Sequence, residues 1–397
     1  MRGMRGGISR RQLLVGTTGA LGAALVGCGA GSASSGNSRV VWQQDAPLGS
    51  GIASLAASGG TLYAGSNSPS QGSLYAFDAA TGKQRWEYDG GTDLFFAQAP
   101  SEQLAPVCDG DTVYALANPA QHGGAIHAID ATSGKRRWVY SAPRGLATVP
   151  SAGVNSVFTG VGDTEAGGLV ALDRATGIPR WTVPTAQFCG PPAFAAGVVY
   201  AGDSTGNAYA VDAASGKPLW QVACTETGTT RLPDLSVNRP VAANGVVYFA
   251  VETPDDQQPM VYALRAGTGR PAWTATAARR TTSLADLYHG PFLTGSTLCL
   301  PNNATGTVYG LDASSGTRRW QSTGPADDGS SCAEDSLLLI GCRHDGLSAV
   351  DGSTGKVRWQ FPGSGPVGAG PAVAGGIAYV GTASDGPPVD KLYALRL

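Results

Sequence analysis

Asp78-Ala-Ala-Thr-Gly82-Lys-Gln-Arg-Trp86 is the stretch that decides the fold of this chain, because it returns along the whole sequence. In each copy a short apolar run such as Leu74–Phe77 comes first. Glycine follows the aspartate after four residues, and tryptophan follows it after eight. The aspartates of these copies are Asp78, Asp130, Asp173, Asp212, Asp312 and Asp351. Arg265 takes the aspartate position in one further copy, and Arg396 takes it in a last copy that is never finished.

The number of copies can be read from the tryptophans. The chain contains eight of them, and seven close a copy: Trp86, Trp138, Trp181, Trp220, Trp273, Trp320 and Trp359. The eighth, Trp42, lies near the start of the chain, where the end of a copy would lie. Successive tryptophans are 39 to 53 residues apart. A period of this length indicates one repeat architecture rather than several independent domains.

Each copy has the pattern of four short strands. The copy that ends at Trp220 shows the pattern most clearly, with apolar and aromatic runs at 192–195, 198–201, 208–211 and 219–222, separated by turn residues. Four-stranded units at this period are typical of propeller blades. The sequence therefore predicts an all-β, eight-bladed β-propeller of four-stranded antiparallel blades over residues 39–397. Its ring is closed by the N-terminal strand around Trp42, which pairs with the C-terminal blade.

The recurring motif has a structural explanation. The aspartate can accept backbone N–H groups across a tight turn, and the glycine supplies a positive φ. The tryptophan lies on the outer strand, where it can pack on the neighbouring blade and bury a large apolar ring. We therefore interpret the eight tryptophans and six aspartates as structural residues of the repeat. Arg265 lacks the acceptor, so its turn is expected to be held less tightly.

The first 38 residues are excluded from the fold. Residues 1–28 resemble a bacterial export signal, with the twin arginines Arg10 and Arg11 followed by an apolar stretch that ends in Leu25-Val-Gly-Cys28. That ending resembles a lipobox, which predicts lipidation of Cys28, and 29–38 would form a flexible linker. The alternative is a plain secretory signal with a chance cysteine. The sequence thus predicts an extracytoplasmic protein that is anchored to the outer face of the cell membrane.

Bulk composition excludes several classes of function. Only 14% of residues are charged and the net charge is −2, so no basic footprint for nucleic acid is present. No two histidines have zinc-like spacing, and His127 takes a position that is tyrosine in other copies. Asp203–Asn207 and Asp327–Gly329 supply too few oxygens for calcium, so both are interpreted as turns. No metal site is predicted.

A candidate binding site lies where each chain segment enters its innermost strand. A proline recurs there, and the residues before it should face the mouth of the central channel. The candidates for this channel mouth are Gln187, Phe188, Arg231, Asn238, Arg239, Tyr288 and His289. Aromatic and arginine residues on loops suit a protein, peptide or glycan ligand. The alternative is that these side chains only plug the channel.

Six cysteines follow Cys28. An even number in an exported protein permits up to three disulfides, and their connectivity stays open. Cys299 lies in a strand position that is aromatic in other copies, so it can be a buried apolar residue. The six are Cys108, Cys189, Cys224, Cys299, Cys332 and Cys342.

The run from the Leu-Tyr-Ala pattern through Thr-Gly-Lys to tryptophan resembles the β-propeller repeat of pyrroloquinoline quinone (PQQ) proteins. The resemblance covers residues 39–397. It implies kinship with quinone-dependent dehydrogenases, an outer-membrane assembly lipoprotein and sensor domains of bacterial kinases. The dehydrogenases carry adjacent cysteines over the quinone and hold Ca²⁺ with Glu, Asn and Asp. Here no two cysteines are neighbours, and no calcium set can be matched.

Three functions are compatible with these observations. The favoured hypothesis is a monomeric, non-catalytic binding scaffold that contacts the membrane only through its lipid anchor and needs no cofactor. The second is a PQQ- and calcium-dependent oxidoreductase, which would make the chain an enzyme. The third is a sensor or accessory subunit of a cell-envelope complex. The arginine- and alanine-rich composition is typical of a high-GC Gram-positive organism, which lacks an outer membrane.

Overall fold

Short apolar and β-branched runs form 33 strands, and these are the regular elements of the part of the chain that the structure describes. The structure is a computed structural model. It describes residues 38–46, 51–67, 72–90, 105–117, 123–143, 145–163, 165–187, 189–224, 239–251, 260–276, 290–302, 306–323, 331–342, 346–382 and 391–397. No helix among these residues is long and apolar enough to cross a membrane.

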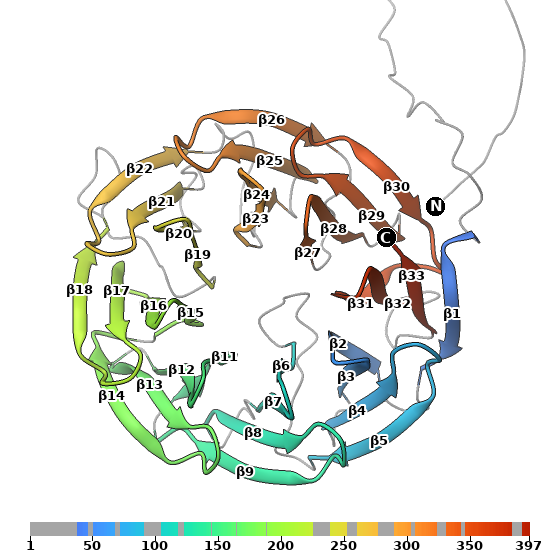
Figure 1. The fold of residues 1–397 in the computed structure, drawn as a ribbon, viewed down its shortest axis with the longest axis horizontal. Helices are drawn as coiled ribbons and strands as arrows, with labels where there is room; N and C mark the ends of the chain where they lie inside the picture. The colour runs from blue at the N-terminus through green and yellow to red at the C-terminus, as the bar shows by residue number, and fades with distance from the viewer. Residues whose placement is uncertain are drawn as a thin grey trace, which may run out of the picture. The chain divides into compact units, whose positions relative to one another are not determined.

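The strands form eight antiparallel sheets arranged as a ring (Figure 1), which confirms the predicted fold. The innermost strands of the blades are β2 (Gly51–Ser58), β6 (Val107–Asp109), β10 (Leu146–Ala147) with β11 (Ser151–Ala152), β15 (Ala193–Ala195), β19 (Val241–Ala243), β23 (Phe292–Thr294), β27 (Ser331–Glu334) and β31 (Val367–Ala374). The second strands are β3 (Thr61–Asn67), β7 (Thr112–Ala117), β12 (Ser156–Gly162), β16 (Val198–Gly202), β20 (Val246–Val251), β24 (Thr297–Asn302), β28 (Leu337–Cys342) and β32 (Ile377–Thr382).

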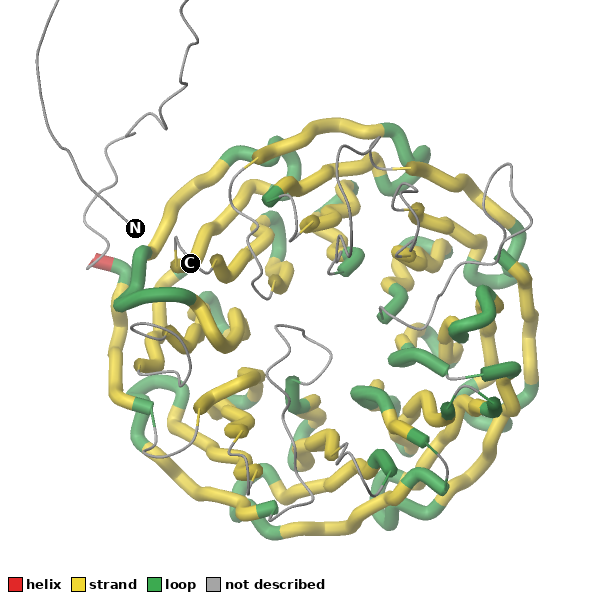
Figure 2. Tube along the Cα trace, turned by 180° about the vertical axis from the view of Figure 1, so that it is seen from behind, coloured by secondary structure: helices red, strands yellow, loops and turns green. Residues whose placement is uncertain are grey.

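The outer half of each blade carries the recurring motif. The third strands, which end at the motif aspartate or its replacement, are β4 (Gly72–Asp78), β8 (Ala125–Asp130), β13 (Gly167–Asp173), β17 (Asn207–Asp212), β21 (Met260–Arg265), β25 (Thr307–Asp312), β29 (Gly346–Asp351) and β33 (Lys391–Arg396). The outermost strands, which carry the tryptophans, are β5 (Gln84–Asp89), β9 (Arg136–Ser141), β14 (Pro179–Thr185), β18 (Pro218–Ala223), β22 (Pro271–Thr276), β26 (Arg318–Thr323), β30 (Val357–Phe361) and β1 (Val40–Asp45). Figure 2 shows the same ring from behind.

The third blade departs from the expected four strands. Its innermost strand is broken into β10 and β11, which both pair with β12. Thr148 lies at the break, where its backbone N–H donates to Gly160 O (2.9 Å) and its hydroxyl oxygen accepts from Gly160 N–H (2.9 Å). Pro150 follows and has no N–H to donate, so the ladder stops there and resumes at Ser151.

The ring closes as the sequence predicts. β1 pairs with β33 along Trp42 opposite Ala394 and Asp45 opposite Lys391. Arg396 N–H donates to Arg39 O (2.9 Å), as Asp78 N–H donates to Lys83 O (2.8 Å) in the first blade. The last motif turn is therefore built from both ends of the ring. A closed ring leaves no open sheet edge.

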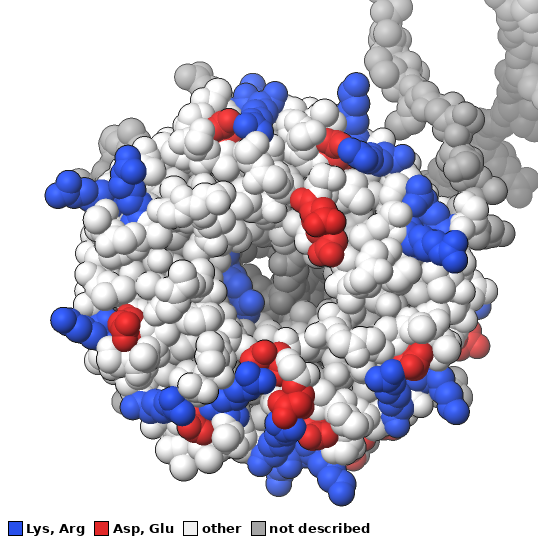
Figure 3. Space-filling model, viewed as in Figure 1, with Lys and Arg blue, Asp and Glu red and all other residues white. Residues whose placement is uncertain are grey.

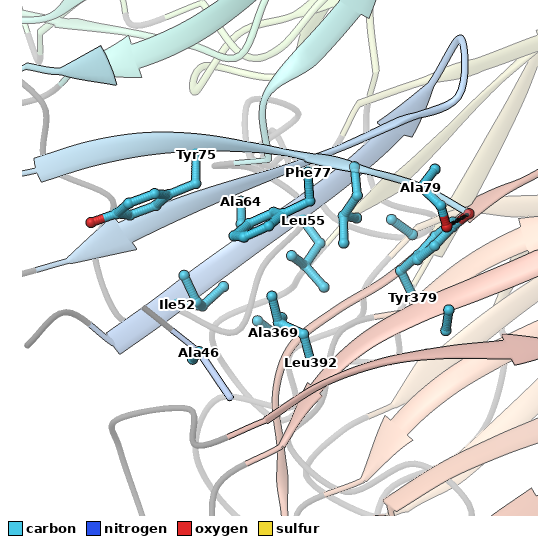
Figure 4. Close-up of a cluster of buried hydrophobic side chains, with 13 residues drawn as sticks. Ala46, Ile52, Leu55, Ala64, Tyr75, Phe77, Ala79, Ala369, Tyr379 and Leu392 are labelled. Atoms are coloured by element: carbon cyan, nitrogen blue, oxygen red, sulfur yellow. Dashed lines mark hydrogen bonds between the residues drawn. The ribbon is translucent and has the colours of Figure 1, made fainter. Parts of the chain in front are cut away.

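The hydrophobic core is divided among the blade interfaces. Eight clusters of buried side chains are found in the described residues, and each joins two neighbouring blades. Figure 4 shows the cluster at the closure, where Leu55 and Phe77 of the first blade face Tyr379 and Leu392 of the last. Each blade is thus stabilised mainly by its neighbours.

Each tryptophan extends this contact to the outer strand. In seven interfaces the indole N–H donates to a backbone carbonyl in the turn of the next blade, at the residue after the motif aspartate or Arg265. These pairs are Trp42 with Ala79 (2.9 Å), Trp86 with Ala131 (3.0 Å), Trp138 with Arg174 (2.9 Å), Trp181 with Ala213 (3.2 Å), Trp220 with Ala266 (2.8 Å), Trp273 with Ala313 (3.1 Å) and Trp320 with Gly352 (3.1 Å).

The indole ring also lies on the motif glycine of the next blade. A Cβ atom at Gly177 would be 2.5 Å from Trp138, closer than real Cβ atoms come to other atoms. The eighth interface differs because Ser38 stands at the glycine position. There the guanidinium carbon of Arg39 lies 4.7 Å from the centroid of the Trp359 ring. In the other seven turns glycine is therefore required for two reasons: its φ is positive, and a Cβ atom would collide with the tryptophan ring.

Two alanine substitutions separate these requirements. Gly177 and Gly197 both have positive φ (+72° and +80°), but nothing lies within 4 Å of a Cβ at Gly197. We expect Gly197→Ala to cost only the backbone strain, about 1–2 kcal/mol. Gly177→Ala should cost about 1–3 kcal/mol more, since it displaces Trp138. Urea unfolding of both variants measures the difference, and equal losses would contradict the role of the tryptophan contact.

Candidate functional site

The blades give the ring two different faces. In a four-stranded antiparallel blade, the turns between strands one and two and between strands three and four lie at the same edge. We call this edge the turn face. In the first blade its two turns are joined by Ala79 N–H, which donates to Gly60 O (3.0 Å). The remaining connections start and end at the opposite edge, the loop face, which includes the segments that enter the innermost strands.

On the turn face the motif aspartates hold their own turns. Asp78 Oδ1 accepts from the backbone N–H (2.9 Å) and the hydroxyl (2.8 Å) of Thr81, and Gly82 N–H donates to Asp78 O (2.8 Å). Asp130 and Asp173 form the same bonds with Ser133 and Thr176. The Arg265 turn keeps its backbone bonds, including Gly269 N–H to Arg265 O (2.8 Å), but has no carboxylate acceptor.

An arginine partner of these aspartates was missed by the sequence interpretation. In five blades the residue directly before the tryptophan is an arginine that forms an ion pair with the aspartate seven residues earlier. The pairs are Arg85–Asp78 (2.6 Å), Arg137–Asp130 (2.6 Å), Arg180–Asp173 (2.6 Å), Arg319–Asp312 (2.5 Å) and Arg358–Asp351. The spacing could have been recognised in the sequence. Arginine stands seven residues after the aspartate in these five copies, whereas Ala272 stands seven residues after Arg265 in the copy that lacks the aspartate.

These bonds keep the turn aspartates ionised. Hydrogen bonds from Arg85 and Thr81 lower the pKa of Asp78 from 3.8 to about 2, and those from Arg180 and Thr176 lower the pKa of Asp173 to about 2. The pKa values of the other four aspartates are lowered by similar bonds from serine and arginine. A carboxylate held in this way supports a turn and is poorly suited to transfer protons.

A dependence of stability on pH follows. Because the folded-state pKa lies below the unfolded value, the ionised aspartates stabilise the fold fully above about pH 4. We expect the melting temperature to fall as the pH drops from about 4 to about 2. In the Asp78→Asn/Asp173→Asn variant the melting temperature should be lower at neutral pH and should depend less on pH in this range. An unchanged pH profile in that variant would contradict the assignment.

Two of the seven predicted channel-mouth residues lie in the described part of the chain. Arg239, at the start of the fifth blade, donates from Nη2 to Val149 O (3.2 Å) and Pro150 O (2.9 Å) of the third blade. Gln187 Oε1 accepts from the Ser204 hydroxyl (3.2 Å) in the fourth blade. Both residues link separate segments of the loop face. Phe188, Arg231, Asn238, Tyr288 and His289 lie outside the described residues.

A buried carboxylate lies next to this segment. Asp203 is fully buried and accepts from Tyr209 OH (2.6 Å), Thr205 Oγ1 (2.8 Å) and Asn207 N (2.9 Å). Its backbone bridges to Cys189, two residues after Gln187. Burial and the Asp203 carboxylate raise the pKa of Tyr209. The segment is a turn, as the sequence predicts, and its donors occupy the carboxylate.

Four of the six cysteines after Cys28 are buried. No disulfide joins any two of the six, so the three possible disulfides do not form. Burial raises the pKa of Cys108 and of Cys224 to about 12, and that of Cys299 to about 11, so these residues stay protonated near neutral pH. Cys299 is fully buried in the core. His127 is also buried, and its Nδ1 lies 3.0 Å from Tyr88 OH.

The described residues contain no group of three or more histidine, cysteine, aspartate or glutamate side chains that could hold a metal ion. The sequence has no adjacent cysteines to cover a quinone. Arg10, Arg11 and Cys28 of the predicted signal lie outside the described residues.

Comparison with known sequences finds relatives with the same repeat. A family model described as outer membrane protein assembly factor BamB matches residues 31–187, 165–334 and 304–395. A serine/threonine-protein kinase, AfsK of Streptomyces griseus, is 31% identical over 167 residues, which are 38% of this chain and 19% of the kinase. BamB of Xanthomonas campestris is 28% identical over 276 residues, which are 55% of this chain and 63% of that protein. The chain therefore spans less than two thirds of these relatives.

Solved structures share the fold at low sequence identity. BamB from Moraxella catarrhalis aligns with a TM-score of 0.65 and 14% identity, over 90% of this chain and 99% of that one. Quinohemoprotein alcohol dehydrogenase from Comamonas testosteroni aligns with a TM-score of 0.66 and 15% identity, over 90% of this chain and 76% of that one. Because a scaffold and an enzyme align equally well, the fold alone does not select a function.

Proposed function

Because the chain belongs to the propeller family described as outer membrane protein assembly factor BamB, we propose that it is a protein-binding scaffold of the cell envelope. The observation that carries this proposal is the closed ring itself. It holds Gln187 and Arg239 at its loop face on a rigid frame. Loops carried by a rigid scaffold are common binding surfaces.

The partner would bind at the loop face, around the channel mouth. Arg239 spans from the fifth blade to the third, and its side chain is exposed. Arginine is enriched among residues that carry binding energy at protein interfaces. Long runs of sequence lead into the innermost strands of the second, fifth and sixth blades, such as 225–238 before the fifth, and would offer further contact area. A protein or an extended peptide fits this surface better than a small ligand. A glycan is the alternative.

The place of action would be the outer face of the cell membrane. The twin arginines Arg10 and Arg11 would direct export, and lipidation of Cys28 would anchor the ring through the linker at 29–38. A monomer agrees with a ring that is complete within one chain. The assembly role named for the BamB relatives includes an outer membrane, and the proposal here is limited to an envelope scaffold. An accessory subunit of an envelope complex is one form that this scaffold can take.

Site-specific photo-crosslinking tests the binding face. A photoreactive amino acid at Gln187 should give a discrete cross-linked species in intact cells, because this side chain lies at the proposed interface. The control places the same amino acid at Lys83 on the turn face, where no partner protein is expected. The products are compared by electrophoresis of membrane fractions. Cross-links of equal yield from both positions, or none from Gln187, would rule out the loop face.

A PQQ titration tests the enzymatic alternative. The purified ring is titrated with PQQ in the presence of Ca²⁺ and followed by tryptophan fluorescence and calorimetry. We expect no saturable binding at micromolar quinone, since the sequence has no adjacent cysteines and the described residues contain no group of three or more histidine, cysteine, aspartate or glutamate side chains that could hold a metal ion. Stoichiometric binding would favour a small quinoprotein oxidoreductase over the scaffold.

A further inference from the structure

The cations of this protein are concentrated on one face of the ring. Residues 39–397 contain 23 of the 27 lysines and arginines and all 29 acidic residues, a net charge of −6. Sixteen of those 23 cations nevertheless lie on the motif turns or in the first two residues of the outer strands, at the edge of the turn face. We call this set the cationic rim. It consists of Arg39, Lys83, Arg85, Lys135, Arg136, Arg137, Arg174, Arg180, Lys217, Arg265, Arg270, Arg318, Arg319, Lys356, Arg358 and Arg396.

The acidic residues of the turn face do not cancel this charge. Ten carboxylates lie on the turns of this face. Together with the sixteen cations of the rim they give the face a net charge of +6. Seven of them are held in ion pairs with six arginines of the rim. These carboxylates are Asp78, Asp109, Asp111, Asp130, Asp173, Asp312 and Asp351. The remaining ten cations of the rim form no ion pair with another described residue, and most of them are exposed.

The unpaired cations surround the whole ring. Lys83 and Lys135 lie in the first two blades, and Lys217, Arg270 and Lys356 lie in the fourth, fifth and seventh. Figure 3 shows this face, with blue groups around its outer edge and red groups both beside them and nearer the central hollow. Cations spread around the outer edge match a flat, extended anionic surface better than a single small anion.

The chain enters the ring at the same face. Ser38 is the first described residue, and Arg39 O accepts from Arg396 N–H in the split turn of the last blade. Cys28 and Ser38 are ten residues apart in the sequence, a separation of at most about 36 Å along the chain. A lipid on Cys28 would therefore hold the turn face, rather than the loop face, close to the bilayer.

We propose that the cationic rim docks the turn face on the anionic phospholipid headgroups of the membrane, so that the loop face points away from the bilayer. The orientation rests on the proposed lipid anchor, but the affinity of the rim for lipid does not. The anchor alone would keep the turn face near the bilayer without laying it flat on the headgroups. Lysine and arginine side chains near an anionic bilayer each add to binding, and their effect falls off within a Debye length. Docking of the rim would leave the loop face as the side of the ring that partner proteins can reach.

Vesicle sedimentation of residues 38–397, which contain every strand of the closed ring, tests this proposal without the anchor. The ring should bind phosphatidylglycerol vesicles at about 50 mM salt, bind phosphatidylcholine vesicles far more weakly, and be released at about 300 mM salt. The rim variant Lys217→Gln/Arg270→Gln should bind at least about tenfold more weakly. Gln43→Glu/Gln221→Glu is its control, because it changes the net charge equally at exposed outer-strand positions.

The outcomes separate this proposal from the scaffold function. Equal binding of the two variants, or equal binding to both kinds of vesicle, would overturn the docking of the rim and leave the cross-linking at Gln187 unaffected. Binding to soluble polyphosphate as tightly as to vesicles would assign the rim to a dissolved polyanion instead of a membrane. The melting temperatures of both variants are measured alongside, and a loss of vesicle binding supports the proposal only where the variant remains folded.

Discussion

The contact between each motif tryptophan and the turn of the next blade is the interaction on which the ring depends. In seven of the eight interfaces the indole donates to a turn carbonyl and lies on the motif glycine, so these tryptophans are covered only when another copy follows. An apolar cluster under each contact adds to this coupling. A linear array would leave one tryptophan and one sheet edge exposed. In a closed ring every copy has a neighbouring blade on both sides. Trp42 and the split turn at Arg39 and Arg396 provide that closure.

The same turns give the two faces different chemistry. A tight turn that receives a tryptophan needs a glycine, and in most blades it also holds an ionised aspartate with an arginine partner. Charged residues are therefore concentrated at the turn face, because aspartate and arginine side chains stabilise the turns there. Additional lysines and arginines on the same turns leave that face cationic. The loop face is free of this constraint, so its connections can vary in length and sequence. The motif that builds the blades thus also divides the ring into a cationic turn face and a loop face.

The candidate site was less accessible to sequence reasoning than the fold. The proline frame placed Gln187 and Arg239 at the loop face, but it could not show that Arg239 reaches across to the third blade. That contact joins residues about 90 positions apart, and only the curvature of the ring brings them together. The Arg85–Asp78 pair was visible in the spacing and was overlooked, since the abundance of arginine was attributed to a high-GC organism. The break in the third blade at Thr148 depends on local backbone geometry, although Pro150 marked the place.

By itself the sequence determined the number of blades, the strand order, the motif turns and the closure by the N-terminal strand. These features follow from local turn chemistry and from a period that repeats, and both can be read from neighbouring residues. The tertiary structure decided which face carries the cations, where the chain enters the ring, and which loop residues meet at the channel mouth. It also showed that no disulfide joins the six cysteines after Cys28. Those properties depend on distances between segments far apart in the chain, and these are set only when eight blades share one ring.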